Sequence, residues 1–161
     1  MAQKTTYLGL GSNIGDREAN LREAVEGLAP DVRVLRVSPI YETEPLEYTN
    51  QRWFLNLVVE AGTELFPLQL LSRVGRIERD LGRVRAVPKG PRTIDIDILL
   101  FGNAVVRGAR LEVPHPRMAE RRFVLAPLAD LAPDLRHPAT GRTMREMLDA
   151  APRQTVRRLQ V

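Results

Sequence analysis

The chain has 161 residues, of which 43% are apolar and 27% charged, and its formal net charge is +4. This length and composition predict a single folded domain over residues 1–161 and exclude fibrous and disordered classes, while the absence of cysteine excludes disulfides and thiolate chemistry. No apolar run approaches the roughly 20 residues that span a bilayer and residues 1–7 do not resemble a signal peptide, so a cytoplasmic location without a membrane partner is expected.

The first half of the chain is predicted to alternate strands with a helix. Thr5–Leu10 predicts a short buried strand that ends at Gly11. Arg17–Leu28 predicts a helix, because its apolar residues recur at helical spacing and Asp16 can cap the first turn. Two further strands are predicted. Residues 32–37 alternate apolar and polar side chains, as in a half-buried strand, before Pro39 interrupts the pattern, and residues 54–61 form the next strand.

The second half adds another helix and more strands. Pro67 opens a helix whose apolar positions run from Leu68 to Leu81, and Gly82 is its expected C-terminal residue. Thr93–Phe101 predicts a strand, with another at residues 104–106, and short helices are expected near residues 118–125 and 144–150. This order favours an α+β sandwich with a largely antiparallel sheet of ferredoxin-like character.

Two aspartates share one face of the strand predicted before Phe101. Because alternate strand residues point the same way, Ile94 and Ile96 face the core with Ile98, while Asp95 and Asp97 face the other side, their Cβ atoms about 7 Å apart. Paired carboxylates repel one another, and a divalent cation removes that repulsion. Mg²⁺ prefers carboxylate oxygens and completes its shell with water and phosphate. The pair predicts a magnesium site, with a solvated polar strand face as the alternative.

Basic side chains crowd the loop before these aspartates. Arg83, Lys89 and Arg92 are among them, and the chain's other basic residues are arginines except for Lys4 and histidine. Arginine binds phosphate with two parallel hydrogen bonds, and a metal pair beside arginines suits polyphosphate transfer. The alternatives are a solvated loop and a nucleic-acid patch, and the latter is disfavoured because the nearby Phe101 lies inside the strand and cannot stack on bases.

The glycines and histidines form no familiar cofactor motif. Gly9, Gly11 and Gly15 are spaced G-x-G-x-x-x-G instead of the dinucleotide-binding G-x-G-x-x-G, and Gly11 and Gly15 are expected to serve a strand-to-helix turn. His115 and His137 are far apart in sequence, so a shared metal is not expected, and His115 is interpreted as a loop histidine near phosphate.

The segment GPRTIDIDILLFG at residues 90–102 closely resembles the central motif of the hydroxymethyl-dihydropterin pyrophosphokinases. Other segments resemble the family in the same order, at residues 10–13, 41–46, 54–56, 82–85, 113–116 and 121–123, so the resemblance runs from about Tyr7 to Pro138. It implies a monomeric enzyme with a three-layer α/β/α fold. It further implies transfer of the pyrophosphoryl group of ATP to the hydroxymethyl group of 6-hydroxymethyl-7,8-dihydropterin, giving AMP, as a step in folate biosynthesis.

The resemblance also implies roles for individual residues. Asp95 and Asp97 would bind two Mg²⁺ ions, and Arg83 and Arg92 would act with them in catalysis. ATP contacts are implied for Glu78, Arg83, Arg92, Ile98, Arg110, His115 and Arg121. The pocket for the reduced pterin is implied at Thr43, Pro45, Leu46, Phe54, Asn56, Asp95 and Phe123, with Phe54 stacking and Asn56 hydrogen bonding.

The residues alone leave simpler alternatives at several positions. Phe54 and Phe123 suit ordinary core packing, Asn56 suits an exposed strand position, and Glu78 suits either an arginine partner or a surface acid. The chain also departs from the family at residues 88–89, where an aromatic residue is common, and at Glu47, where glycine is common. A small RNA-binding module and a nucleotide-binding relic without activity are the competing functions, and nucleic acid is not expected as a partner.

Overall fold

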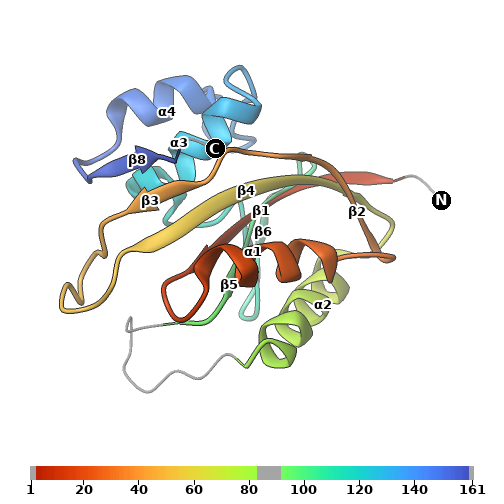
Figure 1. Ribbon diagram of the computed structural model, residues 1–161. Helices are drawn as coiled ribbons and strands as arrows, with labels where there is room; N and C mark the ends of the chain where they lie inside the picture. The colour runs from red at the N-terminus through yellow and green to blue at the C-terminus, as the bar shows by residue number, and fades with distance from the viewer. Residues whose placement is uncertain (1–2, 83–91, 160–161) are drawn as a thin grey trace.

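Figure 1 shows the chain in a computed structural model that describes residues 3–82 and 92–159. Within this part of the chain, the elements follow in the order β1 (Lys4–Ser12), α1 (Arg17–Glu26), β2 (Val32–Val37), β3 (Tyr41–Thr43), β4 (Phe54–Thr63), α2 (Pro67–Asp80), β5 (Asp95–Phe101), β6 (Val106–Arg107), β7 (Glu112–Val113), the 3-10 helix η1 (Met118–Glu120), α3 (Arg122–Leu131), α4 (Met144–Ala150) and β8 (Val156–Arg158).

A six-stranded antiparallel sheet organises the described residues. Its order is β5-β1-β4-β3-β8, and β2 also pairs with β4. β2 and β3 share one edge of β4, where β2 pairs with residues 59–63 and β3 with residues 54–56. Pro39 lies between them and cannot donate to the ladder. The succession β1-α1-β2-β4-α2-β5 is the split β-α-β-β-α-β arrangement, so the predicted ferredoxin-like character is confirmed.

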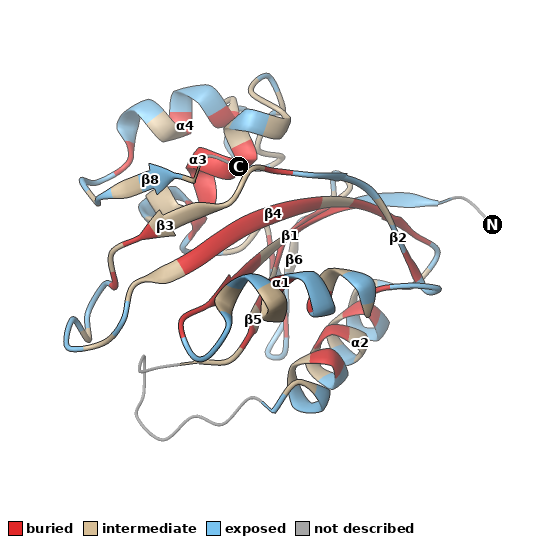
Figure 2. Ribbon diagram, in the orientation of Figure 1, coloured by how far each residue is buried: buried red, intermediate tan, exposed pale blue. Residues whose placement is uncertain are grey.

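Helices cover both faces of the sheet and complete three layers (Figure 1). α1 and α2 lie on one face, and α3 and α4 lie on the other. Each face has its own apolar cluster: Leu8 and Leu10 belong to the cluster under α1 and α2, while Val58 and Leu125 belong to the cluster under α3 and α4. Figure 2 shows β4 buried along most of its length between these layers. The expected three-layer α/β/α sandwich is therefore confirmed.

Helix α1 follows its sequence pattern closely. Leu21 and Ala24 are buried against the sheet. The carboxylate of Asp16 accepts a hydrogen bond from the backbone N–H of Ala19 at 3.1 Å, as the expected N-terminal cap. The helix ends at Glu26, two residues before the predicted Leu28, and Leu28 is still fully buried.

Helix α2 buries a different stripe from the one its sequence suggested. Leu70, Val74 and Ile77 are its buried residues, at i, i+4 and i+7. Leu68 is exposed, because two residues correspond to about 200° of rotation and place it opposite Leu70. Gly82 follows the last turn, as predicted.

Predicted boundaries in the second half of the chain also differ from the observed ones. β5 begins at Asp95 instead of Thr93, and the short strand predicted at residues 104–106 is β6 at 106–107. The helix predicted near residues 118–125 is divided into η1 and α3, because the backbone of Arg121 is extended between them. In the described residues, no helix combines enough length and apolar character to cross a membrane.

The edge strand β2 is less buried than its alternation predicted. A register shift between Val34 and Arg36 places one extra residue in this strand opposite β4. Leu35 and Val37 are exposed beyond the shift, at 41% and 43%. The predicted half-buried face therefore holds only at the start of the strand, where Val32 is buried.

Candidate active site

A cavity of about 420 Å³ opens on the face of the sheet that carries α3. This volume lies within the range of small-molecule sites, about 300–1,000 Å³. Its lining comes from β1, β3, β4, β5, α2, the loop after β7 and the start of α3, and it includes twelve of the residues implied by the family resemblance: Thr43, Pro45, Leu46, Phe54, Asn56, Glu78, Arg92, Asp95, Asp97, His115, Arg121 and Phe123. These residues, which are scattered along the sequence, meet in one place.

Two glycines of β1 form the floor of this cavity. In the β1–β5 register, Gly9 pairs with Asp97 and Gly11 with Asp95, while Gly11 also pairs with Asn56 of β4. A Cβ on Gly11 would lie 2.6 Å from Asn56 Nδ2, so glycine is needed there. The expectation that Gly11 serves the strand-to-helix turn is wrong, because it lies inside β1; Gly15 takes the turn, with a φ of 68°.

The two aspartates share the cavity face of β5, as their alternation predicted. Ile94, Ile96 and Ile98 are buried on the opposite side, while the side chains of Asp95 and Asp97 remain 23% and 33% exposed. Both carboxylates therefore present oxygen atoms to the cavity.

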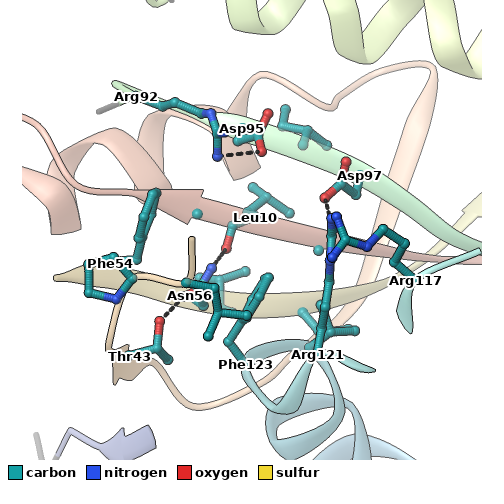
Figure 3. Close-up of a pocket in the computed structure, with 18 of the residues that line it drawn as sticks. Leu10, Thr43, Phe54, Asn56, Arg92, Asp95, Asp97, Arg117, Arg121 and Phe123 are labelled. Atoms are coloured by element: carbon teal, nitrogen blue, oxygen red, sulfur yellow. Dashed lines mark hydrogen bonds and ion pairs between the residues drawn. The ribbon is translucent and has the colours of Figure 1, made fainter. Parts of the chain in front are cut away.

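Cationic groups lie beside both carboxylates (Figure 3). An Nη1 atom of Arg92 is 3.5 Å from Asp95 Oδ2, and Arg121 Nη1 is 3.6 Å from Asp97 Oδ2. His115 Nε2 lies 4.0 Å from Asp97 Oδ1. The result is an alternating set of carboxylates and cations that can receive a metal–polyphosphate complex.

His115 takes part in this set as a neutral imidazole. Burial, followed by the positive charges of Arg121 and Arg117, lowers the pKa of His115 to about 4, while Asp95 acts in the opposite direction. The contact with Asp97 is therefore not an ion pair at neutral pH. The backbone N–H of Arg117 donates to His115 Nδ1 at 3.2 Å, which leaves the ring proton on Nε2, facing the aspartate.

The carboxylate pair fits Mg²⁺ by its chemistry. It offers hard oxygen atoms that are partly exposed, and Mg²⁺ is usually held by one or two carboxylates together with water and substrate phosphates. The described residues contain no cluster of three or more acidic, histidine or cysteine side chains that would form an all-protein cage. A metal here would need oxygen atoms from a bound substrate as well as from Asp95 and Asp97.

The position of Arg92 is fixed through its backbone. Asn13 Oδ1 accepts the Arg92 N–H at 2.7 Å, and the Asn13 N–H donates to the Arg92 carbonyl at 3.0 Å. The guanidinium carbon lies 6.0 Å from the centre of the Phe54 ring. Its Nε is buried and has no hydrogen-bond partner among the described residues. A buried donor of this kind beside a cavity calls for an acceptor from a ligand.

Asn56 lies at the other end of the cavity and is held in one orientation. Its Oδ1 accepts the Thr43 hydroxyl at 2.6 Å, and its Nδ2 donates to the Leu10 carbonyl at 3.4 Å. Asn56 and Thr43 are buried, which overturns the simpler interpretation of Asn56 as an exposed strand residue. Figure 3 shows Phe54 and Phe123 on either side of Asn56. An oriented amide between two rings suits a flat heteroaromatic molecule.

An ion pair at the rim of the cavity joins the loop between β3 and β4 to the loop after β7. Arg117 Nη2 donates to Glu47 Oε1 at 3.2 Å, and Arg117 Nε donates to Glu120 at 3.2 Å. Glu47 has a φ of 57°, a left-handed conformation that favours the glycine common in the family. Leu46, beside it, is 39% exposed on the rim.

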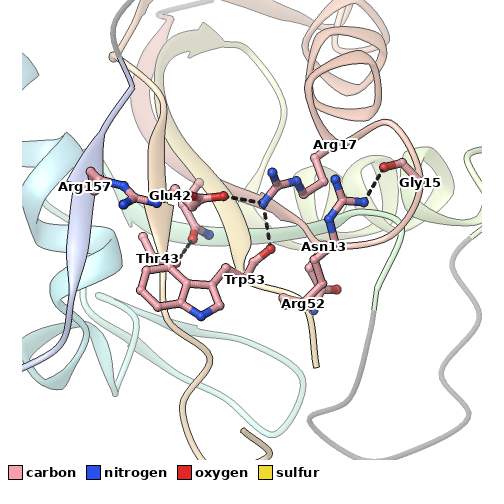
Figure 4. A network of polar contacts seen from close by, with 9 residues as sticks. Asn13, Gly15, Arg17, Glu42, Thr43, Arg52, Trp53 and Arg157 are labelled. Atoms are coloured by element: carbon pink, nitrogen blue, oxygen red, sulfur yellow. Dashed lines mark hydrogen bonds and ion pairs between the residues drawn. The ribbon is translucent and has the colours of Figure 1, made fainter. Parts of the chain in front are cut away.

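A polar network supports β3 and the start of β4 from behind (Figure 4). Arg17 Nη1 donates to Glu42 Oε2 and to the Trp53 carbonyl, both at 2.9 Å. Arg157 of β8 binds the other oxygen of Glu42 and lies 5.8 Å from the centre of the Trp53 ring. Hydrogen bonds from Arg157 and Arg17 lower the pKa of Glu42. The network therefore fixes the backbone just before Phe54.

Two of the implied residues that the structure describes fall outside the cavity lining. Ile98 is buried in the core beneath α1 and α2, and Arg110 is exposed in the turn between β6 and β7. Arg83, together with Lys89, lies outside the described residues. Glu78 does reach the cavity from α2, where its Oε2 accepts the N–H of Ile96 at 2.8 Å on the outer edge of β5.

Sequence reasoning missed several residues of the site. Gly9 and Gly11 line the cavity, and glycine inside a strand pattern is a known sign of close approach. Glu47 and Arg117 also line it, but their pairing spans 70 residues and has no local signal. Asn13 has no signal in the sequence beyond its place in a segment that matches the family. Its side chain connects its own loop to two others, to one through Arg92 and to the other through Gln51 and Arg52.

Comparison with known proteins identifies the family. Residues 7–133 match the family model described as 7,8-dihydro-6-hydroxymethylpterin-pyrophosphokinase. The chain belongs to this family. It is 52% identical over 137 residues to the 2-amino-4-hydroxy-6-hydroxymethyldihydropteridine pyrophosphokinase of Bacillus subtilis, covering 84% of this chain and 82% of that protein. It is 45% identical to the Pseudomonas aeruginosa protein of the same name, covering 95% of each. The expected family, and with it a diphosphotransferase, is confirmed.

Other similar proteins are longer than this chain. It is 44% identical to the folic acid synthesis protein fol1 of Schizosaccharomyces pombe, covering 96% of this chain but 21% of that protein. A solved HPPK-DHPS in complex with substrates has a TM-score of 0.73 at 16% identity, and it is covered over 43% of its length. The Plasmodium falciparum HPPK-DHPS with pteroate has a TM-score of 0.75 at 18% identity, covered over 42%. These structures support the fold.

Proposed function

We propose that this pyrophosphokinase transfers the β,γ-pyrophosphoryl group of ATP to the hydroxymethyl group of 6-hydroxymethyl-7,8-dihydropterin, a step toward folate. The observation that carries the proposal is that one cavity contains both a set of residues suited to a polyphosphate and a set suited to a flat heterocycle. Asp95 and Asp97, with their cations, lie at one end, and Asn56 lies between Phe54 and Phe123 at the other. A polyphosphate and a flat heterocycle bound there would meet.

The polyphosphate end would bind ATP with two Mg²⁺ ions on Asp95 and Asp97. Arg92, Arg121 and neutral His115 would donate hydrogen bonds to the phosphate oxygens, and the buried Nε of Arg92 would gain the acceptor it lacks among the described residues. Bound Mg²⁺ supplies charge neutralisation on the phosphates. The remaining implied contacts, from Glu78 in the cavity and from Arg83, Ile98 and Arg110, are part of the proposal.

The pterin end would bind the ring between Phe54 and Phe123. The Asn56 amide would form in-plane hydrogen bonds with the edge of the heterocycle, because Thr43 and the Leu10 carbonyl hold the amide in one orientation. Pro45 and Leu46 would contact the heterocycle from the rim of the cavity. Asp95 would contact the hydroxymethyl group, since Gly11 pairs with both Asp95 and Asn56 and leaves no side chain between them.

The reaction needs positioning more than it needs an acid or a base. The pterin hydroxyl oxygen would attack the β-phosphorus and lose its proton to solvent as the new P–O bond forms, and the bond between the β-phosphorus and the α–β bridging oxygen would break to release AMP. The cations around Asp95 and Asp97 would hold the attacking and leaving oxygens in line and stabilise the charge that develops on the leaving phosphate. No covalent intermediate with the chain is required.

The direct test follows AMP formation by purified protein supplied with ATP, Mg²⁺ and 6-hydroxymethyl-7,8-dihydropterin. We expect AMP only when the pterin and Mg²⁺ are both present. AMP formation without pterin, or its absence from folded protein, would contradict the proposal. A salt-dependent RNA titration of the same inactive protein would then test the RNA-binding alternative.

We also propose that the enzyme acts as a monomer in the cytoplasm. A monomer is what the resemblance to the family implies. The cytoplasm is the compartment that supplies ATP. Light scattering at assay concentration tests the first proposal, and fractionation of expressing cells tests the second.

A further inference from the structure

One glutamine near the end of the chain connects two walls of the pterin end. Gln154 lies in the segment just before β8, which Figure 1 shows beside β3. Its Nε2 donates to the Glu44 carbonyl at 2.8 Å, and its Oε1 accepts the backbone N–H of Phe123 at 3.1 Å. Gln154 does not line the cavity itself. It therefore acts on the cavity only through the two segments that it joins.

The first of these segments is the start of α3. Arg121 precedes the helix and gives it no side-chain cap, so the first N–H groups of α3 lack partners inside the helix. Phe123 carries one of these N–H groups, and Gln154 accepts it from a residue 31 positions away. The bond also fixes the backbone from which the Phe123 ring enters the cavity.

The second segment is the wall after β3. Glu44 stands between Thr43 and Pro45, which both line the cavity. Its backbone N–H donates to the Thr155 carbonyl at 3.0 Å, and its carboxylate accepts the Thr155 N–H at 2.6 Å. With the bond from Gln154 to its carbonyl, Glu44 is held to this segment by its amide, its carbonyl and its side chain.

We propose that Gln154 is a positioning residue for pterin binding. It sets the separation between the Phe123 ring and the wall at Thr43–Pro45, so that the heterocycle fits between them. The inference rests on the proposed function. It extends beyond the residues that carry the family match, since those end at residue 133.

Two variants of Gln154 separate the roles of its two bonds. Gln154→Ala removes both. Gln154→Glu keeps an acceptor for the Phe123 N–H, and a carboxylate near a helix N-terminus is favourable, but it removes the donor to the Glu44 carbonyl. We expect Gln154→Ala to raise the KM for pterin about three- to tenfold, in line with the loss of two hydrogen bonds. We expect Gln154→Glu to raise it as well, with a smaller loss of stability than Gln154→Ala because the bond to the Phe123 N–H is kept.

Gln69 provides the matched control. Its Oε1 accepts the N–H of Phe66 at 2.8 Å at the start of α2, on the opposite face of the sheet, and it does not line the cavity. Gln69→Ala therefore removes a comparable helix-terminal bond away from the site. We expect it to lower stability without changing the KM for pterin. The KM for ATP should stay within about twofold in all three variants.

The experiment measures KM for pterin, KM for ATP, kcat and the urea midpoint of each variant. A raised pterin KM in both Gln154 variants, with an unchanged ATP KM, supports the positioning role. An unchanged pterin KM in Gln154→Glu, or equal changes in both KM values, overturns it. If the parent enzyme forms no AMP with pterin, the proposed function fails. If the parent is active but its variants have the same pterin KM as the parent, the positioning role of Gln154 fails instead.

Discussion

Gly9 of β1 lies opposite Asp97 of β5, and two residues further along the same register Gly11 lies opposite Asp95. A side chain at Gly11 would stand between Asp95 and Asn56, and one at Gly9 would stand between Asp97 and Val58 of β4. Their absence leaves open the sheet face on which the two ends of the cavity meet. The glycine pair of β1 and the aspartate pair of β5 thus line the same part of the cavity, and the glycines leave the space in which the proposed substrates would meet.

Gly11→Ala should weaken pterin binding about tenfold while the chain still folds. The new Cβ would lie 2.6 Å from Asn56 Nδ2, so the amide must leave the orientation that Thr43 holds. A calorimetric titration with 6-hydroxymethylpterin in the presence of a non-hydrolysable ATP analogue measures the effect.

Gly75→Ala is the control for this substitution. Its Cβ would meet only Arg79 Nη1, at 3.5 Å, within helix α2. We expect unchanged pterin affinity and a gain in stability of up to about 1 kcal/mol, because alanine is the better helix former. Equal pterin affinities for the Gly11 and Gly75 variants would show that the open floor is not required.

Asp97→Asn and Asp95→Asn should each lower kcat about 100-fold or more and shift the Mg²⁺ dependence to higher concentration. Asparagine keeps the size of the side chain but removes the charge that would hold a metal and that balances Arg92 or Arg121. AMP formation measured over a range of Mg²⁺ concentrations tests both effects. Asp149→Asn, at an exposed position of α4, is the control and should leave kcat and the Mg²⁺ dependence unchanged. Near-normal turnover in either the Asp95 or the Asp97 variant would contradict the proposal that these residues bind Mg²⁺.

The alternation of residues 94–98 was enough to predict which side chains of β5 reach the site. A strand has a period of two, so buried isoleucines at every second position leave the aspartates on the other face wherever the strand is placed. The same local logic predicted the cap at Asp16 and the split β-α-β-β-α-β order. These features depend on residues that are close together in the sequence, and they can therefore be predicted from it.

Features that depend on distant partners were not predicted. The glycine pattern predicts a turn at Gly11. The steric reason for this glycine is the Asn56 amide of β4, which lies far from it in the sequence. The pairing of Glu47 with Arg117 also needs the assembled fold. Ile98 and Arg110 came from the family resemblance, and only the placement of β5 and of the β6–β7 turn shows that their side chains lie outside the cavity lining.

Arg92→Ala should lower kcat about 100-fold, more than it weakens ATP binding. The guanidinium lies 3.5 Å from Asp95 and has a buried Nε without a protein acceptor in the described part of the chain. In the proposed reaction it would donate to the phosphate oxygens on which charge develops in the transition state. Arg92→Lys should not restore the rate, because an ammonium lacks the planar fork and the Nε donor. Steady-state kinetics with a separate ATP titration measures the two effects. Arg145→Ala, at an exposed position of α4, is the control, and a raised ATP Kd with unchanged kcat would contradict the role.

His137 should make stability fall as the pH is lowered below about 6.5. Burial lowers its folded-state pKa below that of the unfolded chain. The unfolded chain therefore binds the proton first, and the stability that the neutral ring contributes at higher pH is lost as the pH falls. Its Nδ1 accepts the N–H groups of Ala139 and Thr140, at 3.2 and 3.3 Å, and protonation would remove this acceptor.

His137→Asn tests this directly, because it offers an oxygen acceptor that does not titrate. Urea midpoints at pH 7.5 and pH 5.5 should differ less for this variant than for the parent. His115 is present in both proteins, so it contributes equally to each series. Equal slopes in the parent and the variant would show that His137 makes no pH-dependent contribution.

Glu47 should reveal how much the left-handed backbone at the cavity rim costs. At a φ of 57°, a residue with a Cβ is strained, and glycine is not. We expect Glu47→Gly to be more stable than Glu47→Ala by about 1 kcal/mol, because both lose the ion pair with Arg117 and only alanine keeps the strain. Arg117→Ala removes the ion pairs with Glu47 and Glu120 but leaves a side chain at position 47, and since the three side chains are 45%, 47% and 62% exposed, it should change stability by less than about 1 kcal/mol. Urea unfolding of the three variants measures these differences, and equal stabilities for Glu47→Gly and Glu47→Ala would mean that the rim relaxes out of this conformation.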